Sequence, residues 1–341
     1  MATVVDREYL SDQRSGGRGI FGSILGRGKA IVLSRLNEGL VGAVLLALVI
    51  IFWLLSPDFM TKSNVRTIFD SVAVIGVLSV GQAFVIITAG IDLSQGAIVA
   101  LAGVISGYYM APSGGSVFLG VMVGLAVGLG VGLLNGLIVA YTRVPAFIVT
   151  LATLLICGGG ALLFTSGAPL ANLLPSVGRF GFSYVWVLPY LFFITLGVML
   201  IGALVLNKTK YGRYVYAIGS NLRAAKLAGL RTRGILVSVY VISAVLSAIG
   251  GMMLMAYVNE ATPTAGANFE LDAIAAVVIG GGSLFGGQGS AITAVVGALL
   301  LGVLSNGTEI LGVSSYMEQL LLGVVVVASV FVDSYRRRRA V

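Results

Sequence analysis

Few polar side chains that could act on a solute lie within the long apolar stretches of this sequence. Asp92 is the clearest acidic residue between such stretches, and a charge inside a membrane is costly enough to be a candidate for function. The alternative is a helix cap, because Asp92 and Ser94 directly precede an apolar segment and could accept hydrogen bonds from its free amides. Both roles can hold together where a broken helix ends at a cavity.

Several other side chains could line an aqueous route for a hydroxylated solute. Together with Asp92, the candidate translocation pathway consists of Gln82, Thr88, Asn135, Phe147, Thr150 and Asn306. The alternative for the polar members is hydrogen bonding between helices, which is worth about 0.6 kcal/mol per bond in a membrane. The sequence leaves both interpretations open.

Catalytic, metal and cofactor sites are not expected in this chain. It has no histidine, and its single cysteine, Cys157, excludes an intrachain disulfide and a cysteine-cluster metal site. The nearest approach to a phosphate-binding loop, at residues 22–30, lacks the Ser or Thr that follows the lysine of that motif. We therefore expect that the chain is not an enzyme and binds no cofactor.

The composition indicates which elements hold these side chains. Hydrophobic residues make up 58% of the 341 residues and charged residues only 10%, whereas soluble domains carry about 25% charged residues. A membrane helix needs about 20 mostly apolar residues. We therefore expect an all-α, polytopic membrane helix bundle. Its roughly ten transmembrane helices are expected at residues 39–56, 67–88, 93–111, 117–140, 145–165, 186–206, 234–257, 271–283, 291–306 and 315–333.

Glycine accounts for 48 residues, and its spacing is informative. Gly124, Gly128 and Gly132 form a stripe that would let two membrane helices approach closely. Six glycines among residues 280–289 cannot form a stable helix that faces lipid. That stretch is expected to be a turn near the cytoplasmic interface, packed against the basic loop at 207–233, with a re-entrant segment as the alternative.

Basic residues predict the orientation of the bundle. Of the 21 Lys and Arg residues, 18 fall in segments that share one side if the helices alternate, and the others are Lys62, Arg66 and Arg179. Because cytoplasmic loops are enriched in Lys and Arg, both termini are expected to be cytoplasmic. The expected organisation is a cytoplasmic tail at 1–38, a transmembrane domain at 39–333 and a basic cytoplasmic tail at 334–341.

A weak internal similarity is compatible with an inverted repeat. Asn135-Gly136 and Asn306-Gly307 fall in the fourth and ninth expected helices, which run in opposite directions as such a repeat requires. Chance similarity in a sequence rich in Gly and Leu is the alternative.

The basic loop at 207–233 contains a possible short helix near Asn221–Gly229 that ends at a glycine. Ala224, Ala225, Leu227 and Ala228 would give this helix a face of mostly small side chains that could dock into a cleft of a partner. The alternative is a loop whose charges only set the topology.

This loop resembles the cytoplasmic loop of monosaccharide-type ABC permeases, which has a Gly-x-Asn…Ala-Ala…Ala-Gly-Leu pattern. Four further stretches are similar to the same family, at residues 90–94, 135–136, 145–151 and 280–287, and the resemblance runs from about residue 40 to 333. Gln95 and Gly282 depart from the family pattern, because a small apolar residue and a threonine are usual there.

The resemblance implies a function and a set of partners. The loop would be the coupling segment that seats in an ATPase subunit, through Gly219, Asn221, Arg223, Ala224, Ala225, Ala228, Gly229 and Leu230. Partners would be ABC ATPase subunits that bind ATP and magnesium, a periplasmic or lipid-anchored solute-binding protein, and a second permease copy in a homodimer or related heterodimer. The chain would lie in the lipid of the bacterial inner membrane, carry a monosaccharide or related polyhydroxylated solute, and bind no nucleic acid. The alternative function is a stand-alone secondary transporter or channel for a small polar solute.

Overall fold

The computed structural model describes residue 39, residues 41–314 and part of the stretch 316–331. The expected tails at 1–38 and 334–341 therefore lie outside the described residues. The helices are Val41–Leu55, η1 (Pro57–Met60), α3 (Lys62–Ile87), α4 (Gln95–Tyr109), α5 (Val117–Tyr141), α6 (Ala146–Thr165), α7 (Pro175–Gly181), α8 (Tyr190–Lys208), α9 (Lys210–Ser220), α10 (Leu222–Leu227), α11 (Thr232–Val258), α12 (Phe269–Ile279) and α13 (Ala291–Ile310). The described residues within 316–331 are also helical.

The expected all-α membrane bundle is confirmed. The named strands of the described chain are β1 (Tyr184–Val185) and β2 (Leu188–Pro189), which pair antiparallel in a short hairpin. Six described helices are long and apolar enough to cross a membrane, namely α3, α5, α6, α8, α11 and α13. Because Val41–Leu55 and α4 are shorter and α12 has only 11 residues, the expected number of about ten spans is not confirmed.

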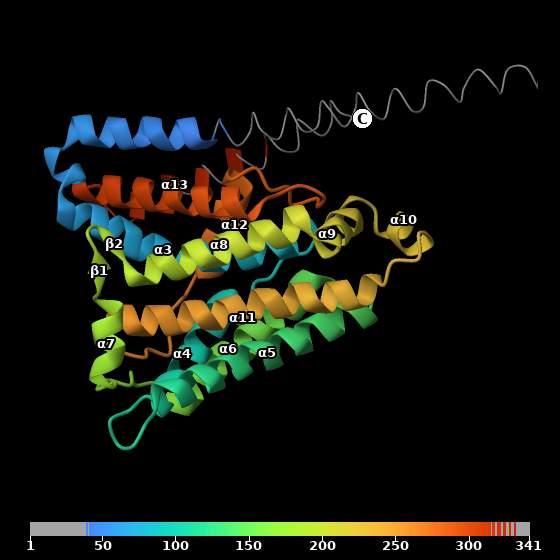
Figure 1. Cartoon of the computed structure of the whole chain (residues 1–341), viewed down its shortest axis with the longest axis horizontal. Helices are drawn as coiled ribbons and strands as arrows, with labels where there is room; N and C mark the ends of the chain where they lie inside the picture. Colours follow the sequence, from blue (N-terminus) through green and yellow to red (C-terminus); the bar gives the residue numbers. More distant parts are fainter. Residues whose placement is uncertain are drawn as a thin grey trace, which may run out of the picture.

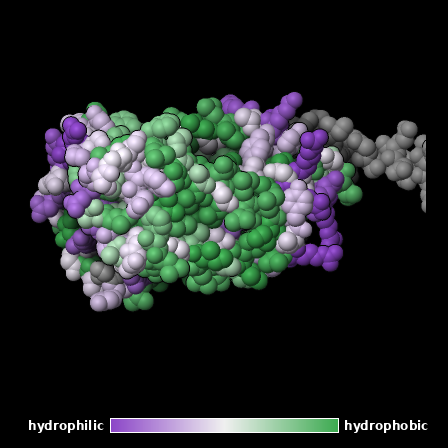
Figure 2. All heavy atoms as spheres, turned by 90° about the horizontal axis from the view of Figure 1, so that it is seen from below, coloured by the Kyte–Doolittle hydropathy of each residue, from purple (hydrophilic) through white to green (hydrophobic). Residues whose placement is uncertain are grey.

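Helix α3 forms the centre of the bundle. It packs against α8, α11, α12 and α13 (Figure 1). Within its most apolar stretch of 18 residues, 89% is buried. A helix that is apolar all round has to be buried in protein or to face lipid. Helices α5 and α6 lie farther out, and in each of them only 22% of the corresponding 18-residue stretch is buried. Their exposed leucine, isoleucine and phenylalanine side chains fit a broad apolar surface between two more polar ends (Figure 2).

The expected glycine stripe lies between α5 and α11. A Cβ atom on Gly128 would approach the Ala244 carbonyl oxygen to 2.8 Å, and one on Gly132 would approach the Val241 Cα atom to 2.7 Å. Both neighbours are backbone atoms of α11, so the two helices could not stay at this separation with a larger residue. The stripe therefore sets the distance between α5 and α11.

The basic residues gather at the two ends of the bundle, as the sequence predicts. Lys62 and Arg66 begin α3, and Arg179 lies on α7 beside the hairpin. The more numerous basic residues lie on α9, α10 and the start of α11, at the opposite end (Figure 1). Which end is cytoplasmic stays a prediction, as does the inverted repeat.

Three helix boundaries differ from the expected ones for local reasons. Helix α3 begins at Lys62 because Thr61 caps it, and its polar first turn hides this start from a hydropathy pattern. Helix α8 begins at Tyr190, because Trp186 adopts a positive φ of 57° in the preceding hairpin. Helix α12 ends at Ile279, where three glycines follow and Gly281 has a φ of 87°.

Candidate functional site

The candidate site is built around a break between α3 and α4. Helix α3 ends at Ile87, a turn with Ala89 at a positive φ of 62° follows, and residues 90–94 have no regular secondary structure. This link is mostly buried, although it leaves backbone groups without helical partners. Irregular backbone at membrane depth has to be satisfied by surrounding protein or water.

Asp92 satisfies one of these backbone groups, the Ser94 amide. Its side chain is fully buried, and its Oδ1 atom accepts hydrogen bonds from the Ser94 amide at 2.9 Å and the Ser94 hydroxyl at 2.6 Å. Its Oδ2 atom accepts from the Ser243 hydroxyl of α11 at 2.7 Å. These hydrogen bonds tie the link to α11.

The expected helix cap is therefore corrected in its detail. Ser94 holds the N-cap position of α4 and makes no capping hydrogen bond with its side chain. Asp92 precedes the cap by two residues and binds the amide of Ser94, not an amide of the first helical turn. It positions the start of α4 by fixing the residue before the helix.

Asn135, which the sequence singled out, joins the same network from α5. Its Nδ2 group donates to the Ser94 hydroxyl at 3.0 Å, and its Oδ1 atom accepts from the Thr153 hydroxyl of α6 at 2.5 Å. Thr150, also on α6, places its hydroxyl 3.3 Å from the Ile91 carbonyl oxygen. One buried polar cluster thus connects the link with α5, α6 and α11.

Among the described residues, the side chains of Gln82, Thr88 and Asn306 make no hydrogen bond to this cluster. Thr88 donates to the Val85 carbonyl of its own helix at 2.8 Å. Asn306 exchanges two hydrogen bonds of 2.8 Å with Asn64, at the start of α3. Phe147 is 50% exposed on α6. Of these three, Asn306 lies apart from the cluster on α13, whereas Thr88 directly precedes the link and Phe147 lies close to Thr150 on α6.

Gln82 is fully buried, and neither atom of its side-chain amide has a hydrogen-bond partner among the described residues. Gln95 is also fully buried, donates to the Leu78 carbonyl at 3.2 Å and to Ser243 at 2.9 Å, and leaves its Oε1 atom without a partner among the same residues. A buried amide group without a partner is costly, by about 1–3 kcal/mol. Both glutamines therefore keep unmet hydrogen-bonding capacity among the described residues.

The short helix expected near Asn221–Gly229 is present as α10, and a glycine follows its end as expected. Asn221 is the N-cap of α10 and accepts from the Ala224 amide at 3.0 Å. Gly229 follows the helix with a φ of 78°, and the Leu230 amide returns to the Ala225 carbonyl at 3.1 Å. A glycine in this conformation is the usual end of a helix.

The faces of α10 differ from the predicted ones. Ala225 is only 5% exposed and packs into the bundle, so it faces this chain and not a partner. Leu227 is 91% exposed, although it is apolar. Arg223, Ala224, Ala228 and Gly229 are exposed as well, and they surround Leu227 on the free surface.

The glycine-rich loop packs against the basic loop at 207–233, which confirms that part of the expectation. The Gly287 amide donates to the Ile87 carbonyl at 2.8 Å, and the Tyr216 hydroxyl of α9 donates to the Gly289 carbonyl at 2.7 Å. Gly219 of α9 leaves no room for a Cβ atom against the Ile87 carbonyl. Helix α9, the glycine loop and the end of α3 therefore form one tightly packed contact.

Sequence reasoning missed several members of the site. Ser243 and Thr153 each lie in a strongly apolar helix, and a search for isolated hydroxyl residues at membrane depth could have found them. Leu227 was not missed, because it belonged to the predicted face of this helix, and the structure leaves it 91% exposed. Among the described residues, no group of acidic or cysteine side chains could hold a metal ion.

The sequence of this chain is similar to a known family and to several known proteins. The family described as branched-chain amino acid transport system / permease component matches residues 64–330. A ribose import permease protein of Haemophilus influenzae is 37% identical over 298 residues, covering 85% of this chain and 91% of that protein. The ribose import permease protein of Bacillus subtilis is 40% identical over 292 residues, with 85% and 90% covered.

A third relative carries a different sugar in its name. The fructose import permease protein of Rhizobium meliloti is 36% identical over 310 residues, which cover 87% of this chain and 85% of that protein. No solved structure matches the chain.

Proposed function

The chain belongs to the branched-chain amino acid transport system / permease component family, and from this premise we propose that it is the permease subunit of an ABC importer for a monosaccharide or related polyhydroxylated solute. The observation that carries the proposal is the similarity to ribose and fructose import permeases over most of both chains. The all-α membrane bundle supports it, because such a bundle can enclose a pathway through lipid.

The proposal includes the partners of the chain. A permease subunit of this kind takes its energy from separate ATPase subunits, which bind ATP and magnesium, and receives its solute from a periplasmic or lipid-anchored binding protein. A second permease copy completes the pathway. This chain itself binds no cofactor, catalyses no reaction and has both termini in the cytoplasm of a bacterial cell.

The exposed side of α10 is the proposed ATPase contact. Leu227 is the anchor of this contact, because an exposed apolar side chain gains most from burial in a partner. Movement of α10 would reach α9 and, through the close contact of Gly219 with Ile87, the end of α3 and the link to α4. Energetic coupling between the ATPase and the solute pathway has to be reciprocal.

A stand-alone, ion-coupled transporter is the second candidate, and one observation favours it. Asp70 and Asp92 are both almost fully buried within the apolar bundle, and ionisable residues at membrane depth often carry ions or protons. This candidate predicts that transport continues without ATP, whereas the ABC importer predicts that transport stops when ATP is absent.

Copurification of an ATPase subunit with the tagged full-length chain tests the proposal. Leu227→Asp should lower the amount of bound ATPase by at least about 10-fold, because it places a charge in an apolar contact. Arg223→Ala should have a smaller effect, since a charge at a rim mainly changes the association rate. Trp186→Asp is the matched control, because Trp186 is 77% exposed at the opposite end of the bundle.

The same experiment can contradict the proposal. If no ATPase copurifies with the wild-type chain, the ABC importer is wrong. If Leu227→Asp and Trp186→Asp retain equal amounts of ATPase, the contact does not lie on α10.

A further inference from the structure

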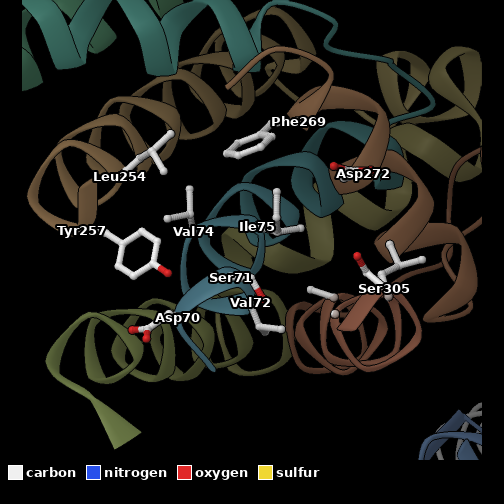
Figure 3. Close-up of a pocket in the computed structure, with 13 residues that line it drawn as sticks. Asp70, Ser71, Val72, Val74, Ile75, Leu254, Tyr257, Phe269, Asp272 and Ser305 are labelled. Carbon is white, nitrogen blue, oxygen red and sulfur yellow. The ribbon is translucent and has the colours of Figure 1, made fainter. Parts of the chain in front are cut away.

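A pocket of about 300 Å³ lies near the hairpin end of the bundle, between α3, α11, α12 and α13 (Figure 3). Its walls are mainly aliphatic, and its polar groups come from Asp70, Ser71, Tyr257, Asp272 and Ser305. Small-molecule sites occupy about 300–1,000 Å³ and combine apolar walls with a few polar groups. A pocket of this size suits one small polar molecule.

Asp70 is the unusual member of this pocket. Its side chain is 3% exposed. Its Oδ2 atom accepts a hydrogen bond from the Tyr184 hydroxyl of the hairpin at 2.9 Å, while its Oδ1 atom has no partner among the described residues. A buried carboxylate oxygen without a donor is costly, so a donor from outside the chain would be bound favourably.

The surroundings of Asp70 are held in place by the hairpin. The Arg66 guanidinium lies over the Tyr184 ring at 4.3 Å and donates to the Trp186 carbonyl at 2.8 Å. Burial, with the hydrogen bond and charge of Asp70, raises the pKa of Tyr184 to about 12. Tyr184 therefore remains a hydrogen-bond donor at neutral pH and occupies Oδ2, which leaves Oδ1 for a ligand.

The other side chains indicate the class of ligand. Figure 3 shows Tyr257 on the same side of the pocket as Asp70, with Asp272 and Phe269 across from them. The Tyr257 hydroxyl can donate or accept, and the rings of Tyr257 and Phe269 offer flat apolar faces. A cation would need several oxygen ligands converging on one point, whereas Asp70 and Asp272 lie on opposite sides.

We propose that this pocket is a binding site for one monosaccharide molecule, with a sugar hydroxyl donating to Oδ1 of Asp70, a second hydroxyl bonded to Tyr257, and the carbon face of the ring against Phe269. The site deepens the proposed function and rests on it. In the proposed orientation the hairpin end is external. The pocket would then receive the solute before it moves deeper into the bundle.

Saturation-transfer NMR of the full-length chain in lipid nanodiscs tests the site, with D-ribose, D-fructose and D-galactose as probes. At least one sugar should bind saturably to the wild type. Asp70→Asn should weaken this binding by about 10-fold or more, because it removes a charged acceptor. Tyr257→Phe, which keeps the ring, should weaken it several-fold.

Matched controls separate binding from folding. Asp58→Asn and Tyr190→Phe change the same residue types at the same end of the bundle but outside the pocket, and they should bind as the wild type does. Absence of saturable binding to the wild type overturns the site. Equal binding by the pocket variants and the controls overturns it as well, as does calcium chloride binding that Asp70→Asn abolishes while sugar binding is absent.

ATP-dependent sugar uptake by the complete importer distinguishes this failure from failure of the proposed function. Normal uptake with no binding at the pocket means that only the site is wrong. If wild-type importer takes up none of the three sugars, the proposed function is wrong, and the site is overturned with it.

Discussion

Asp92 and Ser243 show how a single buried carboxylate can organise a membrane site. The carboxylate receives two hydrogen bonds from Ser94 and one from Ser243, and Ser243 in turn accepts one from Gln95. Each group in this chain of bonds depends on its neighbour, so removal of one member leaves another buried group without a partner. The cluster therefore fixes the link between α3 and α4 relative to α11.

Ser243→Ala should destabilise the folded protein by about 1–3 kcal/mol, because it removes a donor to Asp92 and an acceptor for Gln95. Thermal unfolding of the purified chain in detergent would measure the change. Ser238→Ala is a control, since Ser238 lies near the end of the same helix and bonds Tyr211 outside the cluster. An unchanged midpoint for Ser243→Ala would show that these bonds contribute nothing measurable.

Asp92→Asn separates a structural role from a role of the charge in transport. If the carboxylate mainly anchors the link, the variant should lose stability and transport together, because asparagine offers one acceptor oxygen where aspartate offers two. Protein level, thermal stability and solute uptake should be measured on the same preparations. Full stability with lost uptake would show that the charge itself acts on the solute pathway.

At the scale of elements, close contacts made by glycine determine which helices can move independently. Gly132 of α5 faces backbone atoms of α11, whereas a Cβ atom placed on Gly130 of the same helix would have no neighbouring atom within 4 Å among the described residues. The stripe thus joins α5 firmly to α11 along one face only.

Gly132→Val should destabilise the bundle by about 1–3 kcal/mol, because the added side chain forces the two helices apart. Gly130→Val is the matched control, with the same change of residue on the exposed side of α5. Thermal stability of the two variants should therefore differ. Equal stability would mean that α5 and α11 can separate without cost.

Gly219→Val should uncouple ATP hydrolysis from transport while the ATPase remains bound. The change wedges α9 away from the Ile87 carbonyl and the glycine loop, but leaves the exposed face of α10 unaltered. Gly234→Val is the control, because no atom of the described residues lies within 4 Å of a Cβ placed there. Normal coupling ratios in Gly219→Val would contradict this route between ATPase and membrane bundle.

Much of this element arrangement follows from sequence, and the exceptions have physical causes. Long apolar helices such as α5 and α11 can be predicted from the sequence, because a helix that crosses lipid needs a continuous run of apolar residues. The amphipathic helix α9 could not be distinguished from a loop by hydropathy, because its charged residues lower the mean hydropathy of the segment. The direction in which Ala225 faces depends on packing of a six-residue helix, which is too short for a reliable periodic signal.

The candidate site was predicted less completely than the fold. Asp92 and Asn135 could be selected because polar groups in apolar segments are costly. Their partners Ser243 and Thr153 come from distant parts of the chain, so only the tertiary structure brings them together. Asp70 lay near the start of the expected helix at 67–88, whereas α3 begins at Lys62 and its Asp70 side chain is buried.

At the scale of the whole molecule, the larger number of basic residues at one end of the apolar bundle predicts one orientation in the membrane. In a Cys157→Ser background, Ser220→Cys should react with a membrane-impermeant maleimide only in inverted vesicles. Trp186→Cys, at the other end of the bundle and 77% exposed, should react in intact cells. The opposite labelling pattern would reverse the orientation, and it would move the sugar pocket to the cytoplasmic side.

The most direct test of the proposed function is uptake of radiolabelled D-ribose, D-fructose and D-galactose by proteoliposomes. These should contain the chain with its copurified ATPase, and the solute-binding protein should be added outside. We predict that at least one sugar accumulates, that accumulation requires ATP, and that Leu227→Asp abolishes it while Trp186→Asp leaves the ATP requirement unchanged. Uptake by the chain alone without ATP, or uptake of none of the three sugars, would contradict an ABC importer for monosaccharides.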